Sequence, residues 1–115
     1  MININANRKD GKIVYLSVEG HANSAEKGKD IVCAAVSMSF YTLANSLLKA
    51  PKTWFKEAPD LADSLASETG VSVIRCRPVK EYEDYVTLMY ETVLTGIELL
   101  ASSYPDNVKL RVVRG

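Results

Sequence analysis

The sequence is poor in the residue types that most often bind metals or carry catalysis. Its 115 residues include one histidine and two cysteines, and its formal net charge is zero. A chain of balanced charge has no strong field for sequence-independent binding of nucleic acid, so no direct nucleic-acid partner is expected. Two well-separated cysteines do not form a disulfide framework, and a reducing, cytoplasmic location is expected.

Long apolar segments are also scarce in this sequence. Residues 1–6 alternate between apolar and polar types, unlike the start of a signal peptide. No apolar run approaches the roughly 20 residues that span a bilayer, so no membrane association is expected. The length predicts a single domain over residues 1–115.

The periodicity of apolar residues predicts an α+β domain. Period-two alternation indicates strands, whereas spacings of three and four indicate helices. We expect strands over 2–6 and 14–18, a helix over 31–50, a strand over 71–77, a helix over 84–104 and a strand over 108–113. Residues 52–70 are ambiguous, because Leu61 to Leu65 fit either a short strand or a helical turn. The order ββα(β)βαβ predicts a mixed β-sheet with two packed helices.

Each predicted helix has one apolar stripe. In the first helix the stripe comprises Val32, Val36, Phe40, Leu43 and Leu47; in the second it comprises Val86, Met89, Val93, Ile97 and Leu100. These stripes are expected to face the sheet and form the core.

The single histidine and one cysteine flank the same polar loop. Gly20 ends the second predicted strand and His21 follows it, while Asp30 fits the N-cap of the first helix and places Cys33 about three residues inside. The positive end of the helix dipole and its free N–H groups stabilise a thiolate, whose ordinary pKa is about 8.5. A nearby imidazolium would lower this pKa further and then serve as a proton donor. His21 and Cys33 are therefore candidates for general base and nucleophile.

Other interpretations of these residues stay open at the level of sequence. Cys33 would also fit as a small buried residue, and His21 as a structural one. A zinc site formed by His21, Cys33 and Cys76 lacks a fourth ligand and a close cysteine pair, so no metal is expected. A redox sensor at Cys33 has no resolving cysteine nearby in the sequence. Cys76 falls on a strand and is expected in the core. Ser37 lies one turn after Cys33, where its hydroxyl would serve the site or bond to the preceding turn.

The pattern resembles the signature of the bacterial ribosomal-processing cysteine protease family Prp, also called YsxB-like. The resemblance rests on Gly20-His21-Ala22, Gly28 and the block Asp30-Ile31-Val32-Cys33-Ala34-Ala35 with Ser37. It extends over the whole chain, including the second helix that ends at Tyr104-Pro105-Asp106.

The resemblance implies a function and a site. It implies an endopeptidase that removes the N-terminal extension of ribosomal large-subunit protein twenty-seven after an aromatic pair, with His21 as base and Cys33 as nucleophile. Asp30 and Ser37 match supporting positions, and the loop from Asn23 to Lys29 is implied to be a mobile cover. Gly20 and Gly28 would be its hinges.

The resemblance also implies a homodimer and no cofactor. An alternative function is that of a non-catalytic ribosome-assembly module that binds a peptide in the same groove.

Overall fold

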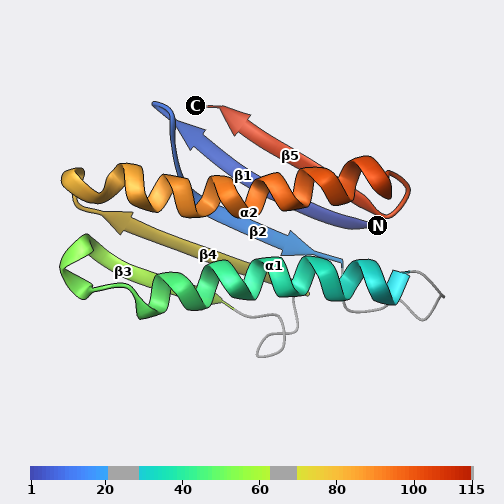
Figure 1. The fold of residues 1–115 in the computed structure, drawn as a ribbon, viewed down its shortest axis with the longest axis horizontal. Coiled ribbons are helices and arrows are strands. Elements are labelled where there is room, and N and C mark those ends of the chain that lie inside the picture. The colour runs from blue at the N-terminus through green and yellow to red at the C-terminus, as the bar shows by residue number, and fades with distance from the viewer. Residues whose placement is uncertain (21–28, 63–69, 115) are drawn as a thin grey trace.

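A computed structural model describes residues 1–20, 29–62 and 70–114 of the chain (Figure 1). The elements are, in order, β1 (Ile2–Lys9), β2 (Lys12–Glu19), α1 (Lys29–Lys49), the short 3₁₀ helix η1 (Lys52–Trp54), β3 (Phe55–Ala62), β4 (Val71–Pro78), the 3₁₀ helix η2 (Lys80–Tyr82), α2 (Glu83–Ser103) and β5 (Val108–Arg114). The predicted α+β class and element order are confirmed.

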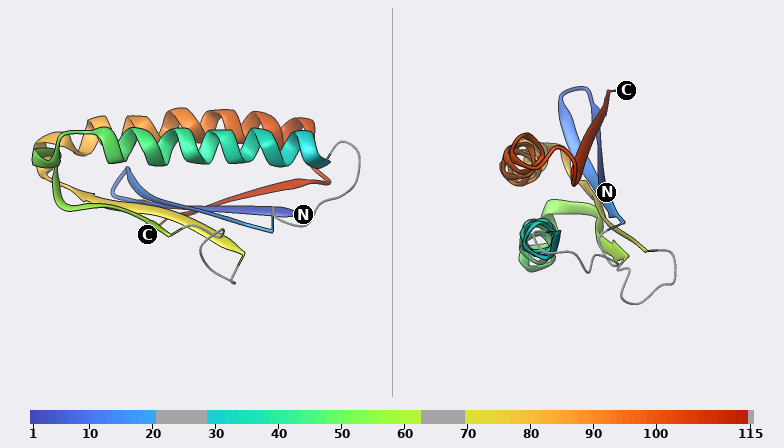
Figure 2. Two further views of the ribbon diagram at one scale, coloured as in Figure 1. Left: turned by 90° about the horizontal axis from the view of Figure 1, so that it is seen from below. Right: turned by 90° about the vertical axis from the view of Figure 1, so that its right-hand side faces the viewer.

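The five strands form one mixed sheet in the order β3-β4-β2-β1-β5. All neighbouring pairs are antiparallel except β1 and β5, which run parallel. Both long helices lie on the same face of the sheet, so the molecule has two layers (Figure 2). No helix of the described residues covers the opposite face of the sheet.

The predicted stripe of α1 is confirmed, but the stripe of α2 is rotated from the prediction. All five predicted α1 residues are buried, and they pack against the sheet. In α2 the buried residues are Val86, Tyr90, Leu94 and Ile97. Met89 and Val93 are half-buried instead, and they line a hollow that α1 also borders. The predicted buried face of α2 was wrong, because it is rotated about the helix axis from the observed one. Contact with α1 gives the helix a second apolar flank, which the spacing does not separate from the buried face.

A β-bulge in the β1–β2 hairpin shifts the alternation of β2. The pairing moves from Ala6–Leu16 to Arg8–Ile13, so two steps along β1 oppose three along β2. Ile13 is consequently fully buried, whereas Val14, which shares the sequence alternation of Leu16, is only half-buried.

Tyr90 of α2 crosses the core to the point where β2 and β4 separate. Its side chain is buried, and its hydroxyl lies 3.1 Å from the carbonyl oxygen of Val14 and 3.3 Å from that of Ile74. Pairing between these strands ends next to them, at Tyr15 and Arg75. The hydroxyl therefore satisfies backbone acceptors where the ladder stops, which avoids the cost of leaving a buried polar group without a partner.

The ambiguous segment of the sequence contains a short helix and an edge strand. Its strand is β3, longer and earlier than the predicted Leu61 to Leu65, of which residues 63–65 lie outside the described part. Register shifts interrupt the pairing with β4 before Asp60, and Pro59 lies in the same stretch. Bulges and proline make an edge strand a poor template for unwanted pairing.

Helix α1 is more apolar than predicted. Ile31–Lys49 spans 19 residues and is long and apolar enough, by length and composition alone, to cross a membrane. The prediction that no apolar segment approaches the roughly 20 residues that span a bilayer was therefore wrong. The core helix of a globular protein passes the same test, and the stripe of α1 is buried against the sheet.

Gly20 fixes the point at which the chain leaves β2. Its φ is +83°, and a Cβ atom on this residue would lie 2.6 Å from the carbonyl oxygen of Met1. The left-handed conformation is costly for other residues. The contact is with a backbone atom, so no change of side-chain rotamer can relieve it. Glycine is therefore required immediately before His21.

We predict that Gly20→Ala lowers the free energy of unfolding by more than the about 1–2 kcal/mol expected for a left-handed conformation alone. The matched control is Gly11→Ala, since Gly11 has a φ of +74° and no atom within 4 Å of its virtual Cβ. Urea denaturation of both variants measures the difference. Equal losses at the two positions would contradict the contact with Met1.

Candidate active site

Cys33 lies near the start of α1, at the boundary between core and solvent. It is half-buried and packs against the hydrophobic core beside the fully buried Val32. The helix begins at Lys29, so Asp30 lies in the first turn and is not the N-cap that the sequence predicted. Cys33 is then the fifth helical residue, immediately after the four whose N–H groups have no partner within the helix.

Ser37 and Tyr41 continue the flank of α1 that Cys33 begins. Residues four apart lie about 40° apart around a helix, and all three side chains are half-buried. Ser39 and Thr42 donate to the carbonyl groups one turn earlier, at 2.9 Å and 2.6 Å. Within the described part of the chain Ser37 makes no such bond, which leaves its hydroxyl to interact beside Cys33.

The remaining predicted site residues fall at or beyond the edge of the described structure. His21 and Gly28 lie outside the described residues, as do residues 23–28 of the predicted cover from Asn23 to Lys29, whose last residue begins α1. Asp30 is placed by its backbone only. Gly20 is described, and β2 ends at the same end of the molecule at which α1 begins (Figure 1). The structure thus brings the residue before His21 and the helix turn that carries Cys33 to one end of the fold.

Cys76 has a different environment on β4. It is half-buried instead of fully buried as predicted, because it also lines a hollow on the open face of the sheet. Its Sγ atom lies 3.8 Å from the hydroxyl oxygen of Tyr90. Burial raises the pKa of the Cys76 thiol to about 11, and this effect outweighs the hydrogen bond with Tyr90, which lowers it. Cys76 is therefore protonated at neutral pH.

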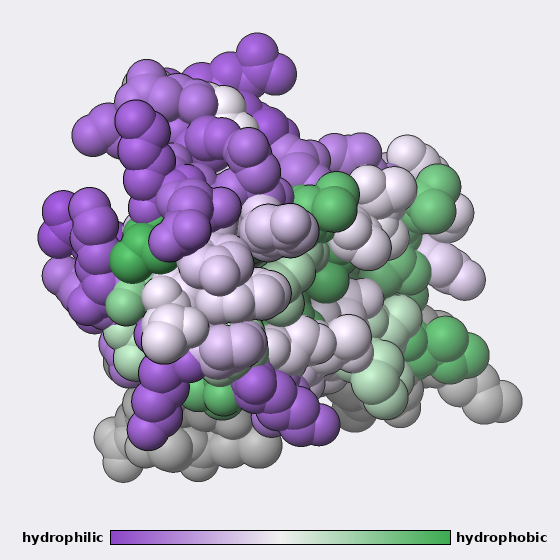
Figure 3. Space-filling view, turned by 60° about the vertical axis from the view of Figure 1, so that its left-hand side comes forward, coloured by the Kyte–Doolittle hydropathy of each residue, from purple (hydrophilic) through white to green (hydrophobic). Residues whose placement is uncertain are grey.

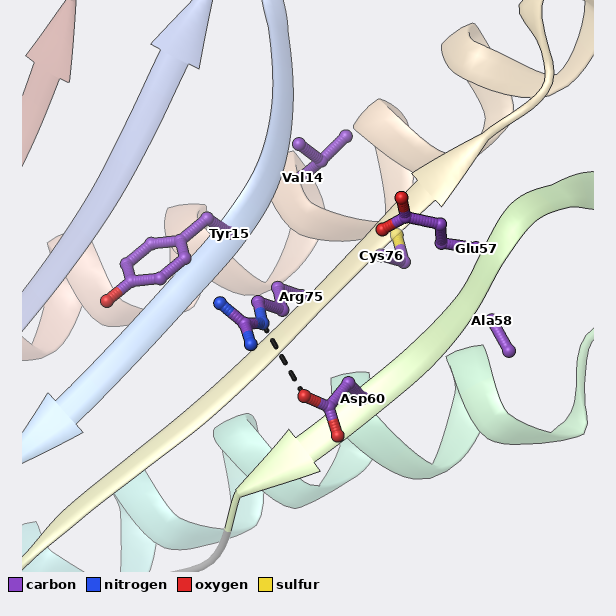
Figure 4. Close-up of a pocket in the computed structure, with 7 residues that line it drawn as sticks. All are labelled: Val14, Tyr15, Glu57, Ala58, Asp60, Arg75 and Cys76. Atoms are coloured by element: carbon purple, nitrogen blue, oxygen red, sulfur yellow. Dashed lines mark ion pairs between the residues drawn. The ribbon is translucent and has the colours of Figure 1, made fainter.

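A hollow beside Cys76 opens on the sheet face that bears no described helix, with a volume of about 440 Å³ (Figure 4). It is lined by Val14, Tyr15, Glu57, Ala58, Asp60, Arg75 and Cys76. The Nε atom of Arg75 lies 3.5 Å from a carboxylate oxygen of Asp60, and both side chains are largely exposed. The hollow therefore presents a protonated thiol and a solvated ion pair, and the high pKa of Cys76 disfavours it as a nucleophile.

The described structure offers no metal site. No cluster of three or more histidine, cysteine, aspartate or glutamate residues occurs among the described residues. Cys33 lies in the second turn of α1, whereas Cys76 is two residues before Pro78, which pairs with Phe55 beyond the other end of that helix. Since α1 is about 30 Å long, the two thiols cannot share one ion.

Comparison with known proteins identifies the family to which this geometry corresponds. The family model for the cysteine protease Prp matches residues 1–109 of the chain. The ribosomal processing cysteine protease Prp of Mycoplasma genitalium is 28% identical over 108 residues, which cover 94% of this chain and 92% of the relative.

Two crystal structures of Prp from Staphylococcus aureus share the fold. The complex with a substrate peptide has a TM-score of 0.78 and 26% identity, and covers 97% of this chain and 99% of the other. The complex with a covalently linked product peptide has a TM-score of 0.74 and 28% identity, with the same coverage of both chains.

We predict that iodoacetamide modifies Cys33 at least about tenfold faster than Cys76 near pH 7.5. The two thiols have similar exposure, so the difference arises from the thiolate fraction, which for a pKa of about 11 is roughly 1 in 3,000 at this pH. Mass spectrometry of timed samples gives both rates. Labelling of Cys76 should then rise as the pH approaches 11, and comparable rates at pH 7.5 would contradict the assignment.

Proposed function

Because the chain belongs to the cysteine protease Prp family and is thus a ribosomal-processing cysteine protease, we propose that it removes the N-terminal extension of ribosomal large-subunit protein twenty-seven. We propose that the cut follows an aromatic pair and that His21 and Cys33 form the catalytic dyad in the cytoplasm. Family members of the same fold that hold a substrate peptide and a covalently linked product support a covalent peptide-cleaving mechanism.

The observation that carries this proposal is the placement of Cys33. Its thiol lies one turn inside the N-terminal end of a 21-residue helix, at the end of the molecule where Gly20 leads into His21. The free N–H groups of the first helical turn and the positive end of the helix favour an anion there. Neither feature is available to Cys76.

The dyad operates in two stages. His21 takes the proton of the Cys33 thiol, and the thiolate attacks the carbonyl carbon of the residue before the cut. N–H groups at the start of α1 stabilise the oxyanion, and protonated His21 donates its proton to the leaving amine. Water, deprotonated by His21, then hydrolyses the thioester and regenerates the thiol. Asp30 and Ser37 are supporting residues in this scheme, and no metal or cofactor takes part.

We predict that Cys33→Ala abolishes cleavage, with a loss of at least about 10³-fold, because the thiolate has no substitute. His21→Gln should cause a comparable loss, whereas Cys76→Ala should stay near native activity. The assay incubates each variant with the extended ribosomal protein of the same organism and determines fragment masses. Full activity of Cys33→Ala would contradict the nucleophile assignment.

The same assay tests the alternative of a binding module. If native protein binds the extended protein with no cleavage at any concentration, the non-catalytic function is correct and the proposed one is wrong.

We also propose that two copies associate through the outer face of the helix layer. Helix α1 has no charged residue between Asp30 and Lys49. The acidic residues Asp84 and Glu91 of α2 are paired with Lys12 and Arg8 of the hairpin, on the other flank. The exposed large apolar residues of the two helices are Ile31, Met38, Leu48, Tyr85, Leu88 and Leu99. Figure 3 shows the resulting pale and green surface beside the hydrophilic hairpin.

The dimensions of this surface suit a second copy. Two helices about 31 Å long and about 10 Å apart present about 600 Å² on each copy, or about 1,200 Å² in total, which meets the lower bound for specific interfaces. An uncharged, apolar patch is self-complementary about a twofold axis, as a homodimer requires.

We predict that Leu88→Lys and Leu99→Lys convert a dimer to a monomer in sedimentation equilibrium at about 50 µM, because each places a charge in the apolar interface. Val113→Lys is the matched control, since Val113 is an exposed apolar residue of β5 outside the helix layer. Monomeric native protein, or variants that stay dimeric, would contradict this interface.

A further inference from the structure

Strand β5 is one of the two edge strands of the sheet, and its pairing is regular. Its seven residues pair with β1 in an unbroken parallel register, from Ile2 with Val108 to Arg8 with Arg114. It contains no proline, and no strand of the described residues pairs with its outer edge (Figure 1). The other edge strand, β3, is interrupted by register shifts and contains Pro59. The outer edge of β5 is therefore the part of the described sheet best able to accept a further strand.

The backbone hydrogen bonds beside β1 define which groups of β5 point outward. The amide of Ile2 donates to the carbonyl oxygen of Asn107 at 2.8 Å. Since the N–H and C=O groups of successive strand residues alternate between the two edges, every second residue after Asn107 also faces β1. The backbone groups of Val108, Leu110 and Val112 consequently point outward, and the amide of Val108 donates into the preceding turn. Within the described part of the chain, Leu110 and Val112 have no strand beside these outward groups, which are two donors and two acceptors.

The side chains along β5 separate by charge between the two faces of the sheet. Leu110 and Val112 are half-buried on the helix face, where they pack against the core. Lys109 and Arg111 are exposed and lie on the face that bears no described helix, because successive side chains alternate. The strand contains three basic residues and no acidic one. One face of this edge is therefore apolar and the other is cationic.

A polar hollow adjoins the cationic face of β5. It has a volume of about 300 Å³ and is lined by Asn3, Ile4, Asn5, Glu19, Lys109 and Arg111. The carboxylate of Glu19 lies two strands away, on β2, so the rim of the hollow nearest the edge is basic. An acidic side chain of a further strand would lie beside this rim.

We propose that the outer edge of β5 binds an extended segment of a partner protein in which apolar and acidic residues alternate. The segment pairs with the backbone of Leu110 and Val112 and packs its apolar side chains beside theirs, while its carboxylates lie next to Lys109 and Arg111. A second copy of this chain is a poor occupant, because two β5 strands related by a twofold axis bring basic side chains close together. The edge lies outside the helix layer, so it stays open in the proposed homodimer, and its role does not depend on cleavage.

Residue-resolved amide hydrogen exchange of the native protein tests the position of the added strand. The probe is a peptide of alternating glutamate and valine with blocked ends, as long as the seven residues of β5. In the free protein the amides of Leu110 and Val112 should exchange at least about tenfold faster than those of Lys109 and Arg111, which face β1. Saturating peptide should slow the first pair at least about tenfold and leave the second pair unchanged. Binding without this alternating protection would overturn the proposal.

Fluorescence anisotropy of labelled peptides tests the chemistry of the segment. The glutamate–valine peptide should bind at least about tenfold more tightly than a peptide with lysine in place of glutamate. It should exceed by a similar factor a peptide of the same composition whose valines form one block, because that order breaks the alternation. Added salt should reduce the preference over the lysine peptide. Equal binding of the three peptides, or no binding at about 1 mM, would overturn the proposal.

Two variants separate the contribution of charge from that of the backbone. Lys109→Glu combined with Arg111→Glu should reverse the preference, so that the lysine peptide binds more tightly. The matched control is Lys56→Glu, an exposed cation on the other edge strand, which should keep the native preference. Val112→Pro removes an outward N–H group and no hydrogen bond to β1, and should weaken binding about tenfold. If the proline variant does not fold, the charge reversal still decides, since an unchanged preference in the double variant contradicts the proposed contact.

Discussion

Burial of one face of the sheet under two helices sets the rotation of α1 about its own axis, and the site depends on that rotation. Five apolar side chains of α1 are buried together, and exposing them would cost on the order of 10 kcal/mol. Val32 is therefore fixed in the core, and Cys33, 100° further around the helix, must lie at the core boundary. The thiol is positioned by its neighbours' packing and needs no dedicated contact to hold it there.

The two cysteines have different surroundings in the fold. Cys33 and Cys76 are both half-buried and both pack against the core. Cys76 lies in a strand beside Tyr90, where burial raises its pKa. Cys33 lies after the free N–H groups of a long helix, where an anion is favoured. Exposure by itself would not distinguish them.

The sequence predicted the elements well because their signals are local. The α1 stripe and the four predicted strands, over 2–6, 14–18, 71–77 and 108–113, depend only on residue types and their spacing. The buried face of α2 was predicted without Tyr90. The hydroxyl of Tyr90 is bonded to the carbonyl groups of Val14 and Ile74, which are far away in the sequence, so spacing along the helix could not reveal its burial. The shift at Ile13 was missed because a bulge leaves no mark in composition. Nothing in residues 52–62 alternates cleanly, since β3 is an interrupted edge strand. For the site, the motif pointed to the end of the fold where β2 ends and α1 begins. The N-cap prediction for Asp30 was wrong because it relied on residue type alone, and the helix begins one residue earlier, at Lys29.

The parallel pairing of β1 with β5 has a consequence for the order in which the sheet can assemble. Each residue of β1 pairs with a residue of β5 that lies 106 positions later in the sequence, from Ile2 with Val108 to Arg8 with Arg114. Until β5 docks, one edge of β1 has open hydrogen-bonding groups, and the sheet under α2 is incomplete. Contacts of such long sequence separation slow folding and leave the partly folded chain prone to non-native strand pairing. The local hairpin of β1 and β2 can form early, but the five-stranded sheet is complete only when β5 joins it.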